Sequence, residues 1–226
     1  MKLIVFDCDG TLVDSQHMIV AAMERAFAGR SLAAPPRDEI LSVVGLSLSL
    51  AVSRLVPHLD EASIHALAED YKGAFADLRR DPAQREPFYP GVREALLELS
   101  AIDRIVLGVA TGKSRRGVAA ILAREELSDL FHTIQTADTH PSKPDPSMLL
   151  TAMEEAGCGP QDTLMIGDTT FDIGMAVAAN VRAIGVSWGY HPAEALAQSG
   201  AHSVVHNADA LMAELRTFSN QGHMAG

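Results

Sequence analysis

The chain has 226 residues, with 18 Lys and Arg against 29 Asp and Glu, which gives a formal net charge of −11. A chain this acidic is not expected to bind nucleic acid in general, because a phosphate backbone requires a basic surface. Hydrophobic residues make up 47% of the sequence, an ordinary proportion for a globular protein that buries a sizeable core.

The sequence has no apolar run of the roughly 18 residues that a membrane span needs. Its first residues lead into a charged segment at Asp7 without the features of a signal peptide. The two cysteines, Cys8 and Cys158, are too few for a disulfide framework and favour a reducing environment. We therefore expect a cytoplasmic protein with no membrane partner.

Short apolar runs alternate with helical patterns along most of the chain. The runs that predict buried strands are residues 3–6, 105–110, 133–136, 163–166, 181–186 and 203–205. The helical patterns among them are residues 92–99, 117–122, 146–156, 173–179 and 208–218. This alternation is typical of βαβ units, so we predict an α/β fold with a Rossmann-like parallel sheet.

Between residues 15 and 89 the alternation stops and only helical periodicity remains. We interpret residues 15–89 as a helical cap inserted after the first strand, and residues 1–14 and 90–218 as the discontinuous catalytic core. Residues 219–226 are polar and small, which predicts a flexible tail.

Polar residues stand where the predicted strands end. Asp7 and Asp9 follow the first strand, Thr111 ends the second and Asp168 follows the fourth. Lys143 lies in the loop after the third. The carboxyl ends of parallel strands meet at one edge of the sheet, where ligands bind. Oxygen ligands from several carboxylates suit Mg²⁺ better than Zn²⁺, so we predict a Mg²⁺ site.

Four ordered motifs resemble those of the haloacid dehalogenase-like hydrolases, in particular the phosphoglycolate-phosphatase-like branch with a helical cap. They are Asp-Cys-Asp-Gly-Thr-Leu-Val-Asp-Ser from Asp7, then Thr111, Lys143, and Gly-Asp-x-x-x-Asp from Gly167 to Asp172. Together with the helical insert, the resemblance covers essentially the whole chain. It implies a Mg²⁺-dependent phosphatase that hydrolyses a small, phosphoglycolate-like phosphomonoester through an aspartyl-phosphate.

The resemblance implies two catalytic residues, the nucleophile Asp7 and the general acid and base Asp9. Thr111, Gly112 and Lys143 would contact the phosphate. Three further expectations concern the metal, the partner of Asp9 and the cap. Mg²⁺ would lie between Asp7, the Asp9 backbone carbonyl and Asp168, supported by Asp172. Thr11 is expected to hydrogen-bond Asp9, and Gly45 lies in a stretch that resembles the specificity loop of the cap.

The sequence departs from the family at one position, since many relatives carry Asn where this chain has Gly112. The sequence does not place Lys113 or the roles of His140 and His191. Arg79 and its neighbour Arg80 are expected to lie on a solvated face.

Two other readings stay open, a sugar-phosphate phosphomutase of the same superfamily and a non-catalytic binding or regulatory module. Hydrolysis is favoured because Thr11 and Gly167 replace the Val and Glu typical of such mutases. The expected partner is a small phosphate ester, and the chain is expected to be a monomer or a homodimer.

Overall fold

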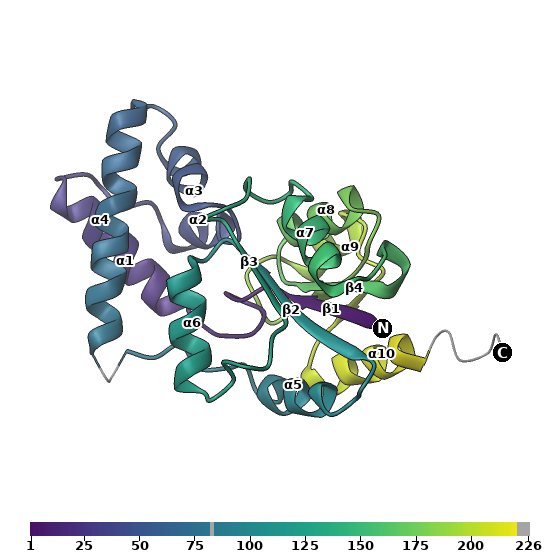
Figure 1. The fold of residues 1–226 in the computed structure, drawn as a ribbon. Coiled ribbons are helices and arrows are strands. Elements are labelled where there is room, and N and C mark those ends of the chain that lie inside the picture. The colour runs from purple at the N-terminus through teal and green to yellow at the C-terminus, as the bar shows by residue number, and fades with distance from the viewer. Residues whose placement is uncertain (82–83, 221–226) are drawn as a thin grey trace.

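A six-stranded parallel sheet in the order β3-β2-β1-β4-β5-β6 forms the centre of the structure (Figure 1). The computed structural model describes residues 1–81 and 84–220. Each predicted strand is present, with ends within one residue of the predicted ones. The strands are β1 (Lys2–Phe6), β2 (Ile105–Thr111), β3 (Thr133–Thr136), β4 (Thr163–Gly167), β5 (Arg182–Val186) and β6 (Ser203–Val205).

Helices cover both faces of the sheet because successive side chains of a buried strand point to opposite faces. In β1, Ile4 and Phe6 join a core with α5 (Val92–Ser100), α6 (Arg115–Arg124) and α10 (Ala208–Asn220). Leu3 and Val5 join a second core on the other face. Its helices are α7 (Ser147–Ala156), α8 (Thr170–Ala178) and the short α9 (Ala193–Gln198), which the sequence pattern did not predict.

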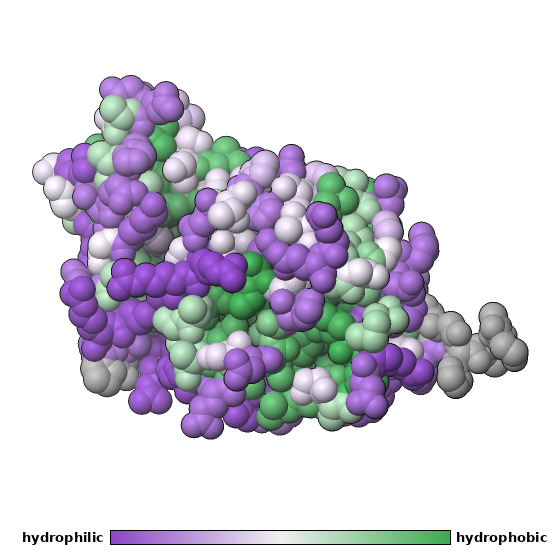
Figure 2. Space-filling view, in the orientation of Figure 1, coloured by the Kyte–Doolittle hydropathy of each residue, from purple (hydrophilic) through white to green (hydrophobic). Residues whose placement is uncertain are grey.

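The stretch between β1 and α5 forms four helices that pack on one another beside the sheet (Figure 1). We call this group, α1 to α4, the helical insert. It has an apolar core of its own, in which Phe27 and Leu67 are fully buried. Figure 2 shows mainly hydrophilic residues on its outer surface over α4, so its apolar side chains face inward. The helices are α1 (Gln16–Gly29), α2 (Arg37–Ser42), α3 (Leu48–Leu55) and α4 (Glu61–Arg80).

The two chain segments that connect the helical insert to the sheet run side by side. The Asp14 N–H donates to the Pro87 carbonyl at 2.8 Å, and the Tyr89 N–H donates to the Leu12 carbonyl at 3.0 Å. Val13 and Phe88 form an antiparallel bridge between them. The insert is therefore joined to the sheet through two connecting segments that are hydrogen-bonded to each other.

Helix α10 continues to Asn220 and includes the first two residues of the expected tail. Ser219 is buried and its hydroxyl donates to the Leu215 carbonyl at 2.7 Å, which explains why the helix does not end at Phe218. The rest of the expected tail, 221–226, lies outside the described residues. No described helix combines the length and the hydropathy that a membrane span requires.

Candidate active site

The candidate site lies at the carboxyl ends of the central strands. The sheet order reverses between β1 and β4, and ligands of open α/β sheets bind at such a switch point. Phe6 pairs with Ile166 in the register of these strands, so Asp7 and Asp168 leave the sheet next to each other. Phe6 also pairs with Val109, which brings the end of β2 at Thr111 to the same edge. The strand register thus brings together side chains that are far apart in the sequence.

Asp7 is fully buried and faces one cation, the buried Lys143. The Lys143 ammonium lies 2.8 Å from Asp7 Oδ1 and 2.6 Å from Asp172 Oδ1. Burial raises the pKa of Asp7 to about 6, with a further contribution from Asp172, although Lys143 opposes the shift. Burial would lower the pKa of Lys143, but the two carboxylates raise it above its usual value and keep the ammonium charged.

The carboxylates of Asp7, Asp168 and Asp172 offer oxygen atoms that all lie within 4.8 Å of one another. Of these three buried carboxylates, those of Asp7 and Asp172 contact the Lys143 ammonium, and Asp7 Oδ2 has no hydrogen-bond partner among the described residues. Burial and the neighbouring carboxylates also raise the pKa of Asp168. These oxygen donors and the uncompensated negative charge fit a divalent cation such as Mg²⁺.

Mg²⁺ is expected to stabilise the protein more at about pH 7.5 than at about pH 5. The pKa of Asp7 in the folded, metal-free protein is about 6, above its ordinary value of 3.8. Between about pH 4 and about pH 6 the folded state therefore binds more protons than the unfolded state. The free energy of unfolding of the metal-free protein should fall as the pH rises through this range. Mg²⁺ competes with that proton and gains affinity over the same range.

Thermal melts with and without Mg²⁺ at the two pH values test this prediction. At a concentration of 100 times the dissociation constant, the expected stabilisation is about 2.7 kcal/mol. An equal Mg²⁺-induced shift in Tm at both pH values would contradict a site made of these carboxylates.

Asp9 lies beside this carboxylate cluster and has different partners. Its Oδ1 accepts hydrogen bonds from the Ser15 hydroxyl at 2.6 Å and the Lys113 ammonium at 2.7 Å. Because Ser15 donates its only proton to Asp9, the Tyr190 hydroxyl must donate to Ser15 across the 3.1 Å between them. Both contacts with Asp9 fall on Oδ1, and neither reaches Oδ2. Asp9 also lines the cavity described below, so Oδ2 is the atom suited to exchange a proton there.

The expected hydrogen bond between Thr11 and Asp9 is absent. The Thr11 hydroxyl instead donates to Asp168 Oδ1 at 2.7 Å, and the Tyr190 N–H donates to Asp168 Oδ2 at 2.9 Å. The turn at Gly10, with a φ of +90°, places Thr11 over the end of β4 rather than beside Asp9. Thr11 therefore orients a candidate metal ligand, and Ser15 and Lys113 hold Asp9.

Close backbone approach around Asp168 requires glycine at two positions. A Cβ atom at Gly10 or at Gly189 would lie 2.2 Å from the Asp168 carboxylate, a distance that side-chain atoms do not tolerate. These glycines let the loop after β1 and the loop after β5 close around Asp168, the candidate metal ligand. Gly189 thereby also positions Tyr190, whose partners are given above.

A cavity of about 560 Å³ lies between the helical insert and the strand ends. Asp7, Asp9 and Thr111 line it on the sheet side. The loop at Gly45, which resembles a specificity loop, lines it on the insert side together with apolar residues of α1, α2 and α4. The structure therefore brings the predicted cap loop to the same cavity as the catalytic candidates.

Gly112 lies against that loop of the insert. A Cβ atom at this position would lie 2.5 Å from the Leu46 carbonyl oxygen and 2.8 Å from that of Gly45. An Asn side chain at this position would collide with the loop in this arrangement. The absence of a side chain at Gly112 thus allows the insert to approach the end of β2 closely.

Gly112→Ala is expected to reduce kcat/KM by roughly 10- to 10²-fold, because the added methyl group displaces the Gly45 loop and the substrate it positions. Gly73→Ala in α4 is a matched control, since the added Cβ there would meet no atom within 4 Å apart from its chain neighbours and the nearby backbone of its own helix. Kinetics and thermal melts of both variants measure the effect. An active Gly112→Ala protein with native kcat/KM would show that this close approach is not needed.

The side chains of His140 and His191, whose roles the sequence left open, make their hydrogen bonds away from the carboxylates of Asp7, Asp9 and Asp168. His140 bonds Ser147 and Gln135, away from the carboxylates. His191 Nδ1 accepts from the Thr170 N–H at 3.1 Å, so its Nε2–H donates to the Ser42 carbonyl of the insert at 3.1 Å. Burial lowers the pKa of His191, in keeping with this neutral form. His191 is therefore a contact between the core and α2.

The expectation for Arg79 is wrong, because Arg79 is a partner of a buried carboxylate rather than part of a solvated face. Its guanidinium lies 2.9 Å from Glu86, whose side chain is 1% exposed. The neighbouring Arg80 is exposed, as expected. Helical periodicity alone could not predict that one of two consecutive arginines pairs with a buried carboxylate and the other with an exposed one.

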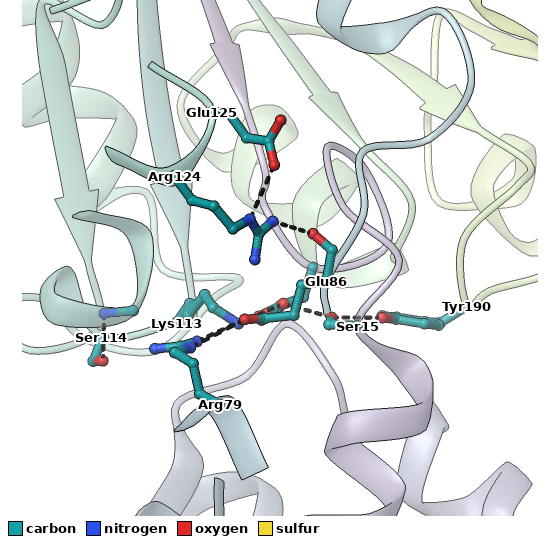
Figure 3. Close-up of polar contacts among 10 residues, drawn as sticks. Ser15, Arg79, Glu86, Lys113, Ser114, Arg124, Glu125 and Tyr190 are labelled. Carbon is teal, nitrogen blue, oxygen red and sulfur yellow. Dashed lines mark hydrogen bonds and ion pairs between the residues drawn. The ribbon is translucent and has the colours of Figure 1, made fainter. Parts of the chain in front are cut away.

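Sequence reasoning also missed the roles of Ser15, Glu86 and Tyr190. Ser15 stands at the end of the first motif, and its position there is the one local signal that could have connected it to Asp9. Glu86 and Tyr190 come from distant segments, and only the tertiary structure brings them to the site (Figure 3).

Comparisons with known proteins agree with the fold and show the family. Residues 4–186 match the model of a family described as haloacid dehalogenase-like hydrolase. The phosphoglycolate phosphatase of Pseudomonas putida is 32% identical over 216 residues, covering 93% of this chain and 78% of that protein. The phosphoglycolate phosphatase of Pseudomonas syringae pv. syringae is 35% identical over 212 residues, covering 90% and 76%.

Solved structures show the same architecture. A predicted phosphatase from Clostridium acetobutylicum has a TM-score of 0.84 and 25% identity, covering 96% of this chain and 98% of that one. A predicted phosphoglycolate phosphatase from Haemophilus somnus has a TM-score of 0.80 and 26% identity, covering 95% and 98%. The predictions of an α/β fold and of a phosphatase of this family are confirmed. The chain belongs to the haloacid dehalogenase-like hydrolases.

Proposed function

We propose that this protein is a Mg²⁺-dependent phosphatase that hydrolyses small phosphomonoesters through an aspartyl-phosphate on Asp7. The observation that carries the proposal is the pairing of two differently placed carboxylates at the end of β1. Asp7 belongs to a buried cluster that needs a cation, whereas Asp9 is held through Oδ1 alone beside a cavity. One is suited to attack phosphorus and the other to transfer a proton.

In the first step, an Asp7 carboxylate oxygen forms a bond to phosphorus as the ester P–O bond breaks. Lys143 keeps Asp7 ionised and offsets the negative charge that gathers on the transferred group. The leaving oxygen takes the proton of Asp9. Bound Mg²⁺, held by Asp7, Asp168 and the Asp9 backbone carbonyl with Asp172 in support, would supply further electrostatic stabilisation of that charge.

In the second step, water attacks the phosphorus of the aspartyl-phosphate and gives a proton to Asp9, which restores the starting state. The bond between phosphorus and Asp7 breaks and inorganic phosphate leaves. Thr111 and the backbone of Gly112 would hold the phosphate oxygens, because both lie at the strand end that lines the cavity. The predicted cap, residues 15–89, which contains the helical insert, would exclude bulk water.

Phosphoglycolate is the first substrate candidate, since the two sequence relatives described above carry the name of that activity. The Gly45 loop and the apolar wall of the insert would contact the part of the ester beyond the phosphate. The cavity of about 560 Å³ lies within the range of about 300–1,000 Å³ that holds larger ligands, so bulkier esters belong in the same panel.

Phosphorus NMR of a panel of phosphate esters, incubated with the protein and Mg²⁺, tests the proposal. The panel includes phosphoglycolate, sugar phosphates and nucleoside monophosphates. We expect stoichiometric release of inorganic phosphate and no isomeric phosphate. An isomerised sugar phosphate that forms faster than inorganic phosphate would favour the phosphomutase, and no turnover at all would favour a binding module.

A further inference from the structure

Glu86 carries a buried carboxylate in the segment that returns from the helical insert to the core. Lys113 donates to its Oε1 at 2.7 Å, and Arg79 donates to its Oε2 at 2.9 and 3.1 Å (Figure 3). Its backbone carbonyl accepts from Arg124 of α6 at 2.6 Å. One carboxylate oxygen therefore binds a cation of the core, and the other binds a cation of α4.

Lys113 connects Glu86 to the candidate acid and base. Its ammonium is 2.7 Å from both Glu86 Oε1 and Asp9 Oδ1, and its side chain is 7% exposed. The same ammonium lies 4.9 Å from the centre of the Phe75 ring, and the Arg79 guanidinium lies 5.0 Å from it. Helix α4 thus contributes two side chains to this cluster around Lys113 and Glu86, the Phe75 ring and the Arg79 guanidinium.

The charged side chains in contact with Lys113 and Glu86 balance one another. Two carboxylates, Asp9 and Glu86, face two cations, Lys113 and Arg79, so these four side chains carry no net charge together. Lys113 also donates to Asp9, where it fixes Oδ1 together with Ser15, and neither of these contacts occupies Oδ2. A carboxylate held by two donors on one oxygen cannot turn freely.

We infer that Glu86 is a positioning residue that makes the orientation of Asp9 depend on the docking of α4. Glu86 holds Lys113 against Asp9 and accepts Arg79 only when the helical insert lies against the core as it does here. This inference rests on the proposed function, because it gives Asp9 the role of acid and base. Moving α4 away would remove Phe75 and Arg79 from the group and loosen Lys113.

The test compares kcat/KM for two esters that differ in their need for an acid. An alkoxide leaving from phosphoglycolate must receive a proton from Asp9, whereas the p-nitrophenolate of p-nitrophenyl phosphate leaves without one. Glu86→Gln is expected to lower kcat/KM about 10- to 10²-fold for phosphoglycolate, or for another alkyl ester that the panel identifies. For p-nitrophenyl phosphate the expected change in kcat/KM is less than about threefold. This ratio reports only the steps up to departure of the leaving group, and p-nitrophenolate leaves without an acid.

Arg79→Gln is the second variant, since its side chain is 26% exposed and its loss disturbs the fold less than the loss of a buried carboxylate. The same selective effect is expected, with a smaller factor of about three to ten. The double variant should match Glu86→Gln alone, because Arg79 acts through Glu86. Asp70→Asn, which removes an exposed ion pair between α4 and Arg30, is the matched control and should leave both esters unaffected.

A selective loss for the alkyl ester in Glu86→Gln, or in Arg79→Gln if the first variant does not fold, supports the inference. An equal loss for both esters, or no loss for either, overturns it and leaves the proposed function standing. If the wild-type protein hydrolyses neither ester nor any member of the panel, the proposed function itself fails and the inference fails with it.

Discussion

Asp7→Asn is expected to abolish hydrolysis, with a loss of kcat of at least about 10⁴-fold, while the protein remains folded. The amide cannot attack phosphorus, so no aspartyl-phosphate forms and the reaction loses its covalent step. Burial and Asp172 disfavour the negative charge of Asp7 in the metal-free protein. An uncharged side chain of the same shape should therefore leave the Tm of metal-free protein unchanged or slightly higher.

Turnover of p-nitrophenyl phosphate with Mg²⁺ and thermal melts of the same preparations measure the two effects. Asp14→Asn is the matched control, since Asp14 belongs to the same motif but its carboxylate bonds only Gln16 among the residues that the structure describes. The control should retain turnover within about twofold. An Asp7→Asn protein with near-native turnover would rule out the aspartyl-phosphate.

Asp9→Asn is expected to lower kcat about 10²- to 10⁴-fold, because both steps lose their proton transfer. The two steps should respond differently to the leaving group. With p-nitrophenyl phosphate the first step proceeds without an acid, and the phospho-enzyme then accumulates because water lacks its base. A burst of p-nitrophenol followed by a slow steady state is therefore expected.

Rapid-mixing kinetics detect the burst, and acid-quenched protein can be analysed for phosphate bound to Asp7 by mass spectrometry. The Asn side chain keeps a carbonyl oxygen that can accept from Ser15 and Lys113, so the local structure should persist. A variant that forms no phospho-enzyme yet binds substrate normally would place the defect in the first step alone. A variant with native kcat would remove Asp9 from the chemistry.

The fold could be predicted because the central strands of the parallel sheet are buried on both faces and read as mainly apolar runs. β1 is the example: Leu3, Ile4, Val5 and Phe6 are each at most 1% exposed. Short elements carry weaker signals, so the six-residue α9 was missed and the end of α10 was placed two residues early. Those boundaries depend on contacts such as that of Ser219, which the local pattern does not contain.

The sequence by itself determined the positions of Asp7, Asp168 and Thr111, because a residue that follows a buried strand has to lie at the edge of the sheet. Local spacing could not determine which side chains meet there. Ser15 donates to Asp9, Thr11 turns to Asp168, and Glu86 accepts from Lys113. Only the tertiary structure decided these contacts, since they depend on how the helical insert packs on the sheet and on glycines that permit close backbone approach.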